Sequence, residues 1–336
     1  MRVFLVGDYR TGTGPANVTL AYDEYLQKSL TRYRHQDAVN KVARAIELAV
    51  RILNCDVVLM SGYSKQNLLT IKLAKMFRKK TAYLMHGCVE HENSINGVPD
   101  VEMNRVERAT MAGTDLILAV SETFSVWLAL HYPELADKIQ AQPNGLKPED
   151  VVRRQSANVE RLPHRIMSIG GGMPRKKIKY ICQAVEQMRR NEAYADTELI
   201  VIGAEGLDTE EINSYSFVKN LGLVPYKQTE ELLRSSQVFV QNSCFETFGL
   251  APVEALVNGA SVLLSKHIGA LELFEEITDG DLINEYDNPA EISGKITNLC
   301  AVGNADRLLD ALDTESVSWE RRTKQLIEAL EQLIEA

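Results

Sequence analysis

The sequence lacks three features that would each define a class of protein: an excess of basic residues, paired cysteines and a long hydrophobic run. Its 37 lysines and arginines are outnumbered by 46 aspartates and glutamates, which gives a net charge of −9. Phosphate contacts usually require a basic surface, so we expect no nucleic-acid partner. The five cysteines are scattered without a C-x-x-C pair, which argues against a disulfide framework and a zinc site.

The hydrophobic runs that do occur are short. None reaches the roughly 18 apolar residues that a membrane-spanning helix needs. The initial run in MRVFLVGD is also too short for the core of a signal peptide. These features predict a cytoplasmic protein with reduced cysteines, and any membrane contact is expected to be peripheral, at the cytoplasmic face.

Short, continuous apolar runs alternate with helix-length segments along the chain. The predicted strands form two series, 2–6, 56–60, 81–85 and 115–120, then 165–169, 198–202, 237–241 and 261–265. Continuous apolar runs are typical of strands that are buried on both faces of a parallel sheet. Segments between them, such as 37–53 and 66–78, have the apolar spacing of helices. This alternation predicts an α/β protein with two doubly wound, Rossmann-like sheets.

The pattern breaks at residues 143–163, which are rich in turn-forming and polar residues. We therefore expect a first domain over 1–160, a second over 161–315 and a terminal amphipathic helix over 316–336. Two such sheets facing each other leave a cleft lined by the carboxyl ends of their strands, where ligands bind in open α/β sheets.

Two candidate sites follow strands of the first series. Gly12 and Gly14 lie in the loop after strand 2–6, just before an expected helix start, and this arrangement favours an anion. Their spacing matches neither a dinucleotide fingerprint nor a Walker A loop, and an ordinary strand-to-helix turn is the alternative. His86 ends strand 81–85, where it is expected to hydrogen-bond a sugar; the alternative is a buried histidine that closes the loop.

The segment IGGGMPRKK follows the first strand of the second series. Gly171 lies in a run of three glycines that permits a tight turn, and Arg175 and Lys176 come next. Cations at this edge of a sheet would stabilise the negative charge of a leaving diphosphate. A solvated run of charges is the alternative.

The most specific segment is CFETFGLAPVEAL, over residues 244–256. Glu246 is expected on the loop after strand 237–241, and Glu254 in the first turn of a helix that begins near Pro252. The two carboxylates would contact different parts of one ligand, and backbone N–H groups between them would act as donors. The intervening candidates are Thr247, Phe248, Gly249 and Leu250.

This segment resembles the E-x7-E motif of the retaining glycosyltransferases of family four, the glycosyl transferases group 1. Arg175-Lys176 resembles the Arg/Lys pair of that family. The resemblance covers nearly the whole chain, and further matches in family order are Asn144-Gly145, Asn242-Ser243, Gly259, Gly269, Glu272 and Trp319.

The resemblance implies a GT-B fold in which the second domain binds a nucleotide-sugar and the terminal helix crosses back to the first, acceptor-side domain. By the same resemblance, Glu254 binds the donor ribose and Glu246 lies near the donor sugar. Arg175 and Lys176 bind the diphosphate, and Val224 belongs to a loop, 221–226, that contacts the base. The family needs no metal or other cofactor, and the leaving phosphate accepts the proton of the acceptor.

The implied activity is retaining transfer of a hexose-type sugar, from a UDP-sugar rather than a GDP-sugar, to a glycan or lipid-linked acceptor in surface-polysaccharide or glycoconjugate synthesis. A catalytically silent GT-B partner of another glycosyltransferase and a GT-B sugar-nucleotide epimerase are the alternatives. Basic stretches at 32–34 and 72–80 favour a peripheral membrane contact, with a solvated helix face as the alternative. The D-x-D sequence at 279–281 is expected to be structural because it lies in a late loop. The sequence carries no signal for an oligomeric state.

Overall fold

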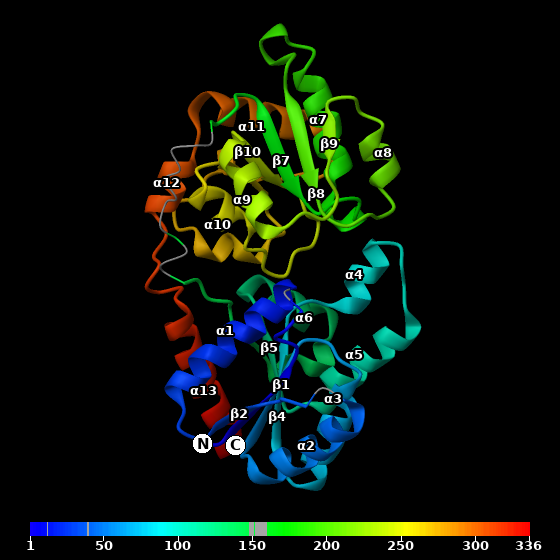
Figure 1. Cartoon of the computed structure of the whole chain (residues 1–336), viewed down its shortest axis with the longest axis vertical. Helices are drawn as coiled ribbons and strands as arrows, with labels where there is room; N and C mark the ends of the chain where they lie inside the picture. Colours follow the sequence, from blue (N-terminus) through cyan, green and yellow to red (C-terminus); the bar gives the residue numbers. More distant parts are fainter. Residues whose placement is uncertain (12, 39, 148–150, 152–159) are drawn as a thin grey trace. The chain divides into compact units, whose positions relative to one another are not determined.

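The computed structural model describes residues 1–11, 13–38, 40–147, 151 and 160–336 (Figure 1). These residues form two compact units, each built around a six-stranded parallel sheet. The first unit contains 1–91, 100–147 and 315–336, and the second contains 92–99 and 148–314. Parallel sheets flanked by helices confirm the predicted α/β class. The predicted boundaries at residues 160 and 315 stay predictions.

The first unit has the strand order β2-β1-β3-β4-β5-β6. Its strands are β1 (Val3–Gly7), β2 (Tyr33–His35), β3 (Val57–Ser61), β4 (Lys80–Met85), β5 (Leu116–Ala119) and β6 (Ile139–Ala141). Its helices are α1 (Gly14–Ser29), α2 (Lys41–Asn54), α3 (Gln66–Met76), α5 (Val101–Gly113), α6 (Glu122–His131), the 3-10 helix Pro133–Lys138 and α13 (Trp319–Glu335). The helix α4 (Val89–Ile95) begins in this unit and ends in the second. Because β3 and β4 lie inside the sheet, their apolar runs are almost completely buried.

The second unit has the strand order β12-β11-β10-β7-β8-β9. Its strands are β7 (Arg165–Ile169), β8 (Glu198–Ile202), β9 (Val218–Asn220), β10 (Val238–Gln241), β11 (Ser261–Ser265) and β12 (Leu282–Ile283). Its helices are α7 (Ile178–Met188), α8 (Thr209–Asn213), α9 (Tyr226–Ser235), α10 (Ala251–Val257), α11 (Pro289–Val302) and α12 (Ala305–Asp310), with 3-10 turns at Pro174–Lys176, Glu192–Tyr194, Gly269–Leu273 and Asp279–Asp281. One buried apolar cluster joins α7 and α11 to the central strands.

The terminal helix α13 belongs to the first unit, where it packs beside α1 (Figure 1). The rings of Tyr22 and Trp319 meet edge to face at 5.0 Å. Gln142 donates to the Tyr22 hydroxyl at 3.0 Å and to the Arg322 carbonyl at 2.9 Å. A Cβ atom at Gly145 would lie 2.7 Å from the Cα of Trp319, so this glycine permits the close approach of the helix start. Among the described helices, none combines the length and apolarity that crossing a bilayer requires.

Candidate active site

A glycine turn at the carboxyl end of β7 brings two cations to the edge of the second sheet. Gly171 has φ +56°, and a Cβ atom there would lie 2.0 Å from the Ala204 carbonyl oxygen. Only glycine fits, because the turn packs directly on the loop after β8. The 3-10 turn that follows then carries Arg175 and Lys176. The structure thus gives Gly171 a packing role, and its predicted contact with a ligand stays a prediction.

The loop after β10 carries Glu246 to the same edge. Its N–H donates to the His267 carbonyl at 3.1 Å, and its carbonyl accepts from the Gly269 N–H at 2.9 Å, as in one step of a parallel ladder. Gly249 has φ +87°, and a Cβ atom there would lie 2.9 Å from the Cγ of Glu246. The loop therefore fixes the position of the Glu246 carboxylate through its backbone.

Arg175, Lys176 and Glu246 form a buried ion cluster. The Lys176 ammonium and the Arg175 guanidinium both contact Oε2 of Glu246, with the Arg175 Nη1 atom at 3.3 Å. On its other side, the Arg175 Nε atom lies 3.5 Å from Oε2 of Glu92. The side chains of Arg175, Lys176 and Glu246 are only 15, 12 and 13% exposed. The structure thus brings together three predicted site residues from two distant segments.

The cluster determines the charge state of Glu246. Burial by itself raises the pKa of this carboxyl, but the attraction of Lys176 and Arg175 outweighs it and lowers the pKa below its usual range. Burial lowers the pKa of the Lys176 ammonium, and attraction to Glu246 opposes that shift. An ionised carboxylate has no proton to give, so Glu246 is unsuited to act as a general acid of the hydrolase kind.

The remaining predicted donor residues lie around this cluster in sequence. Glu254 occupies the first turn of α10 and is half-buried, with Pro252 in the same turn as predicted. Val224 is half-buried in the loop between β9 and α9. Thr247 and Phe248 are buried, while Gly249 and Leu250 are half-buried. Ligand contacts of all these residues stay predictions.

Sequence reasoning missed three neighbours of the cluster. Glu92 pairs with Arg175, and the Asn96 side-chain oxygen accepts from the Arg175 N–H at 3.2 Å. Gln241, at the end of β10, has its Nε2 atom 3.5 Å from Oε2 of Glu246, and its buried Oε1 atom has no partner among the described residues. Glu92 and Asn96 lie in a distant segment, so no local pattern could have indicated them.

In the first unit, His86 follows β4 and ends a chain of hydroxyl groups. Its Nε2 atom lies 2.9 Å from the Ser61 hydroxyl, which lies 2.7 Å from the Thr19 hydroxyl. Thr19 donates to the Pro15 carbonyl at 2.9 Å. Because each hydroxyl has one proton, Ser61 donates to Thr19 and His86 donates from Nε2 to Ser61. Burial lowers the pKa of His86 to about 4, so the ring is neutral at pH 7.

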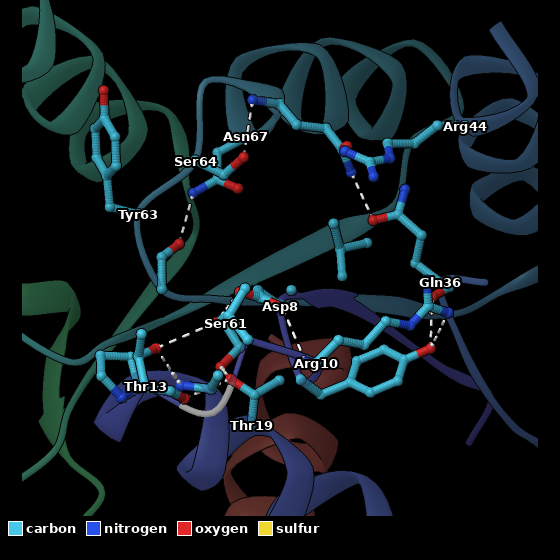
Figure 2. A pocket seen from close by; sticks show the side chains of 18 of the residues that line it. Asp8, Arg10, Thr13, Thr19, Gln36, Arg44, Ser61, Tyr63, Ser64 and Asn67 are labelled. Atoms are coloured by element: carbon cyan, nitrogen blue, oxygen red, sulfur yellow. Dashed lines mark hydrogen bonds between the residues drawn. The ribbon is translucent and has the colours of Figure 1, made fainter. Parts of the chain in front are cut away.

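A pocket of about 540 Å³ opens at the carboxyl ends of β1, β2 and β3 (Figure 2). Its polar lining residues are Asp8, Tyr9, Arg10, Thr11, Thr13, Thr19, Gln36, Arg44, Ser61, Tyr63, Ser64, Gln66 and Asn67. Most of these side chains are neutral hydroxyl or amide groups. Gln36 is 8% exposed, and its Nε2 atom has no partner among the described residues. Such a lining suits a ligand rich in hydroxyl groups.

The glycine loop only partly matches its prediction. Thr13 is the N-cap of α1, with its hydroxyl 3.4 Å from the Ala16 N–H, and both residues line the pocket. Gly14 begins the helix, but a Cβ atom there would meet nothing within 4 Å. Gly12 lies outside the described residues. Ligand binding by either glycine stays a prediction.

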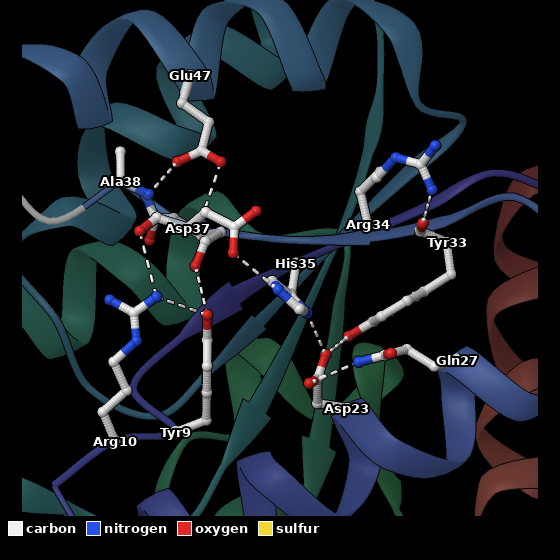
Figure 3. A network of polar contacts seen from close by, with 11 residues as sticks. Tyr9, Arg10, Asp23, Gln27, Tyr33, Arg34, His35, Asp37, Ala38 and Glu47 are labelled. Carbon is white, nitrogen blue, oxygen red and sulfur yellow. Dashed lines mark hydrogen bonds and ion pairs between the residues drawn. The ribbon is translucent and has the colours of Figure 1, made fainter.

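A polar network holds residues 36–38, which follow β2 and form part of one wall of the pocket (Figure 3). Three consecutive carbonyl groups accept from pocket side chains: that of Gln36 from Tyr9 at 3.0 Å, that of Asp37 from Arg10 at 3.2 Å and that of Ala38 from Arg44 at 3.2 Å. The Glu47 carboxylate accepts from the N–H groups of Asp37 and Ala38 at 3.0 and 2.9 Å. These hydrogen bonds hold this wall of the pocket in place.

Both nitrogens of the His35 ring contact carboxylates of this network. Nδ1 lies 2.7 Å from Asp23 and Nε2 lies 2.8 Å from Asp37. Asp23 also accepts from the Tyr33 hydroxyl at 2.6 Å and from Gln27 at 2.8 Å. This ties α1 and β2 to the wall of the pocket.

The D-x-D sequence has structural partners, as expected. Asp281 is 2% exposed, accepts from Arg307 at 2.7 Å and from Asn304 at 2.7 Å, and caps its own turn through Thr278. Asp279 pairs with Lys295 at 3.3 Å. Within the described part of the chain, no group of three or more histidine, cysteine or acidic residues is placed to hold a metal ion.

The match to a protein-family model falls in the second unit. The model of the family "Glycosyl transferases group 1" matches residues 153–309, just under half of the chain, which contain Arg175, Lys176, Glu246 and Glu254. No match was found among curated proteins.

Solved structures match over nearly the whole chain. HepE (Alr3699) from Anabaena, in complex with UDP-glucose, has a TM-score of 0.68 at 15% identity and covers 99% of this chain and 100% of its own. Sucrose-phosphate synthase from Thermosynechococcus elongatus gives 0.70 at 14% identity, with 99% of both chains covered. WaaG, a glycosyltransferase involved in lipopolysaccharide biosynthesis, gives 0.65 at 14% identity over 97% of this chain and 99% of its own.

These similarities define the fold. The chain has the α/β fold of GT-B glycosyltransferases, with two six-stranded parallel sheets flanked by helices. The family match covers residues 153–309, and the solved structures support the fold over the rest of the chain.

Proposed function

We propose that the protein is a retaining glycosyltransferase that moves a hexose-type sugar from a nucleotide diphosphate sugar to a glycan or lipid-linked acceptor. The buried cluster of Arg175, Lys176 and Glu246 carries this proposal, because it places two cations at the edge of the sheet in the region that the family matches. A UDP-sugar is favoured as donor, since HepE, a protein of the same fold, was solved with UDP-glucose and with UDP. Surface-polysaccharide or glycoconjugate synthesis is the corresponding biological role.

The proposed reaction requires stabilisation of the negative charge that develops on the leaving diphosphate. The bond between the anomeric carbon and the diphosphate oxygen breaks, and the acceptor oxygen forms the new bond on the same face of the sugar. The acceptor proton goes to the leaving phosphate, and no metal ion takes part. Arg175 and Lys176 stabilise the developing negative charge of the diphosphate through charge-assisted hydrogen bonds. Donor phosphates would compete with Glu246 for Lys176, which leaves the Glu246 carboxylate available to a sugar hydroxyl.

The other proposed contacts with the donor come from the loop after β10 and from the first turn of α10. Glu254, in the first turn of α10, accepts from the ribose hydroxyls. The segment 247–250 supplies backbone and side-chain contacts to the sugar and phosphates. Val224 lies on the loop that contacts the base, while Gly171 completes the turn beside the phosphates. Gly14 lies in the first unit, beside the pocket that its neighbours Thr13 and Pro15 line.

The pocket of the first unit is proposed to bind the acceptor. Its hydroxyl and amide groups match the hydroxyl groups of a glycan, and its volume of about 540 Å³ accommodates a sugar unit. His86, held neutral and oriented by Ser61, contacts the sugar at the border of this pocket.

A donor panel tests the proposal. The purified protein is incubated with UDP-, GDP- and ADP-sugars, with and without EDTA, and released nucleotide is measured. We expect release from a UDP-sugar that EDTA does not reduce, and loss of this release in Lys176→Gln but not in Lys324→Gln, an exposed lysine on α13. Binding of no nucleotide would instead favour a catalytically silent partner protein.

A further inference from the structure

A second pocket lies at the opposite end of β1 from the proposed acceptor pocket. It has a volume of about 250 Å³ and is formed at the amino ends of β1 and β2 and the carboxyl end of α2. Since a strand rises about 3.3 Å per residue, the length of β1 separates the two pockets by more than roughly 10 Å. Four of its lining residues are arginines: Arg2, Arg32, Arg34 and Arg51.

Only one of these arginines is neutralised by a carboxylate. Arg2 forms an ion pair with Asp56, in which its Nη2 and Nε atoms donate to Oδ1 at 2.5 and 3.0 Å. Arg34 donates to a neutral group, the Tyr33 carbonyl, at 2.8 Å (Figure 3). The side chains of Arg32 and Arg51 have no hydrogen-bond or ion-pair partner among the described residues. Among the described residues, three guanidinium groups therefore surround one pocket without a counter-ion.

The floor of the pocket supplies no negative charge either. Cys55 is 3% exposed, and burial raises its pKa to about 11, so it remains a neutral thiol at pH 7. Two carbonyls near the end of α2 are already satisfied, that of Val50 by the Asn54 side chain at 2.8 Å and that of Ile52 by the Cys55 N–H at 3.4 Å. Val3 and Phe4, which are buried and apolar, complete the floor of the pocket.

Ordinary stabilising roles explain only part of this cluster. Arg51 lies in the last turn of α2, where a cation complements the helix dipole. That argument does not extend to Arg34, which lies on β2, or to Arg32 just before it. The charge of Lys79, from the basic stretch 72–80, also acts on Cys55. Like charges gathered in this way repel one another unless an anion binds between them.

We propose that this pocket binds a phosphate group, which is part of a phosphorylated small molecule or of an anionic lipid headgroup. Arginine is suited to this role because its planar guanidinium donates two parallel hydrogen bonds to phosphate oxygens. Arg32, Arg34 and Arg51 supply the charge, and the apolar floor excludes water from part of the contact. The site is separate from the proposed donor and acceptor sites and does not depend on the proposed function.

Calorimetric titration with inorganic phosphate tests the site directly. Salt is kept low because such contacts are screened. The titrations are repeated in the Arg175→Gln/Lys176→Gln background, so that phosphate binding at the proposed donor site does not contribute. We expect Arg32→Gln/Arg51→Gln to weaken phosphate binding at least tenfold. Arg321→Gln, which removes an exposed arginine of the same unit, serves as the matched control and is expected to bind as the wild type does. Equal binding by the wild type and the double variant would overturn the proposal.

Vesicles distinguish the two sources of the phosphate. Sedimentation with phosphatidylcholine vesicles is compared with and without phosphatidic acid. Binding to the acidic vesicles that the double variant loses indicates a lipid headgroup, whereas phosphate binding without vesicle binding indicates a soluble ligand. If neither phosphate nor vesicle binding depends on Arg32 and Arg51, the pocket is not a phosphate site.

A second variant distinguishes loss of phosphate contacts from loss of phosphate binding through misfolding. Arg51→Lys keeps the charge but removes the bidentate fork, so an intermediate loss of about three- to fivefold is expected. Unchanged thermal unfolding and unchanged UDP binding show that both units remain folded. Full affinity in Arg51→Lys together with full affinity in the double variant would contradict a role for these arginines.

Discussion

The carboxyl-end edges of the two sheets are built in opposite ways. In the second unit, buried charges meet: Arg175 and Lys176 share one oxygen of Glu246. In the first unit, the pocket is lined mainly by neutral hydroxyl and amide groups, and its basic side chains Arg10 and Arg44 donate to backbone carbonyls. The same topology therefore supports a charged site in one unit and a polar, nearly neutral one in the other.

This difference suits two different ligands. A diphosphate needs cations that are held in place and partly shielded from water, because electrostatic stabilisation is stronger in a low-dielectric site. A sugar acceptor needs many directional hydrogen bonds and no net charge. The proposals assign the donor to the second unit and the acceptor to the first on this ground.

The largest effect is expected from removing one cation of the donor-side cluster. Lys176→Gln should lower kcat for donor hydrolysis or transfer at least about a hundredfold, the range seen when one charge-stabilising donor is removed from an active site. Steady-state kinetics measures the change, and Lys324→Gln is the control. A loss below threefold would show that the cluster does not stabilise the leaving group.

Substitution of one glycine in each unit compares how tightly the two sheet edges are packed. Gly171→Ala should lower the free energy of unfolding by about 2–4 kcal/mol, because the new Cβ atom would meet the Ala204 carbonyl and φ is positive. Gly14→Ala should change it by no more than about 0.5 kcal/mol, since nothing lies within 4 Å. Urea unfolding is followed by circular dichroism, because the two tryptophans, Trp127 and Trp319, both lie in the first unit. Equal effects would contradict the packing role of Gly171.

The two glutamates should separate binding from turnover. Glu254→Ala is expected to raise the Kd for UDP about tenfold, as loss of a hydrogen-bonding carboxylate does. Glu246→Ala should mainly lower kcat, because its place is beside the sugar and the reacting phosphate. Calorimetry and kinetics on both variants decide this, and an equal loss of UDP binding in the two would refute the division of roles.

The smallest effect is expected in the hydroxyl chain of the first unit. In the wild type, nitrogen NMR should show His86 as the neutral Nε2–H tautomer down to pH about 5, given its pKa of about 4. Ser61→Ala removes the acceptor of that proton and should cost about 1 kcal/mol of stability, whereas the exposed Ser29→Ala should cost little. An Nδ1–H tautomer in the wild type would contradict the direction of the chain.

Much of the architecture was predictable because buried parallel strands are continuous apolar runs. The strands that sequence reasoning missed are short edge strands with polar residues, such as β2 (Tyr33–His35) and β9 (Val218–Asn220). Edge strands bury less side-chain surface, so their hydrophobic signal is weak.

The site was predictable only where residues are close in sequence or match a family motif. Lys176 and Glu246 are 70 positions apart, and their contact depends on the adjacent strands β7 and β10. Glu92 pairs with Arg175 from still farther away, and no spacing indicates such a pair. The Tyr9, Arg10 and Arg44 contacts to one loop are likewise a product of tertiary structure.

The central claim is that the buried cluster of the second unit binds the diphosphate of a nucleotide-sugar. Calorimetric titration of UDP and of uridine, each against the wild type and Arg175→Gln/Lys176→Gln, tests it most directly. The account predicts that the wild type binds UDP about a hundredfold more tightly than uridine, and that the double variant loses this difference while it remains folded. Failure of the wild type to prefer UDP, or a preference for UDP that survives in the double variant, would contradict it.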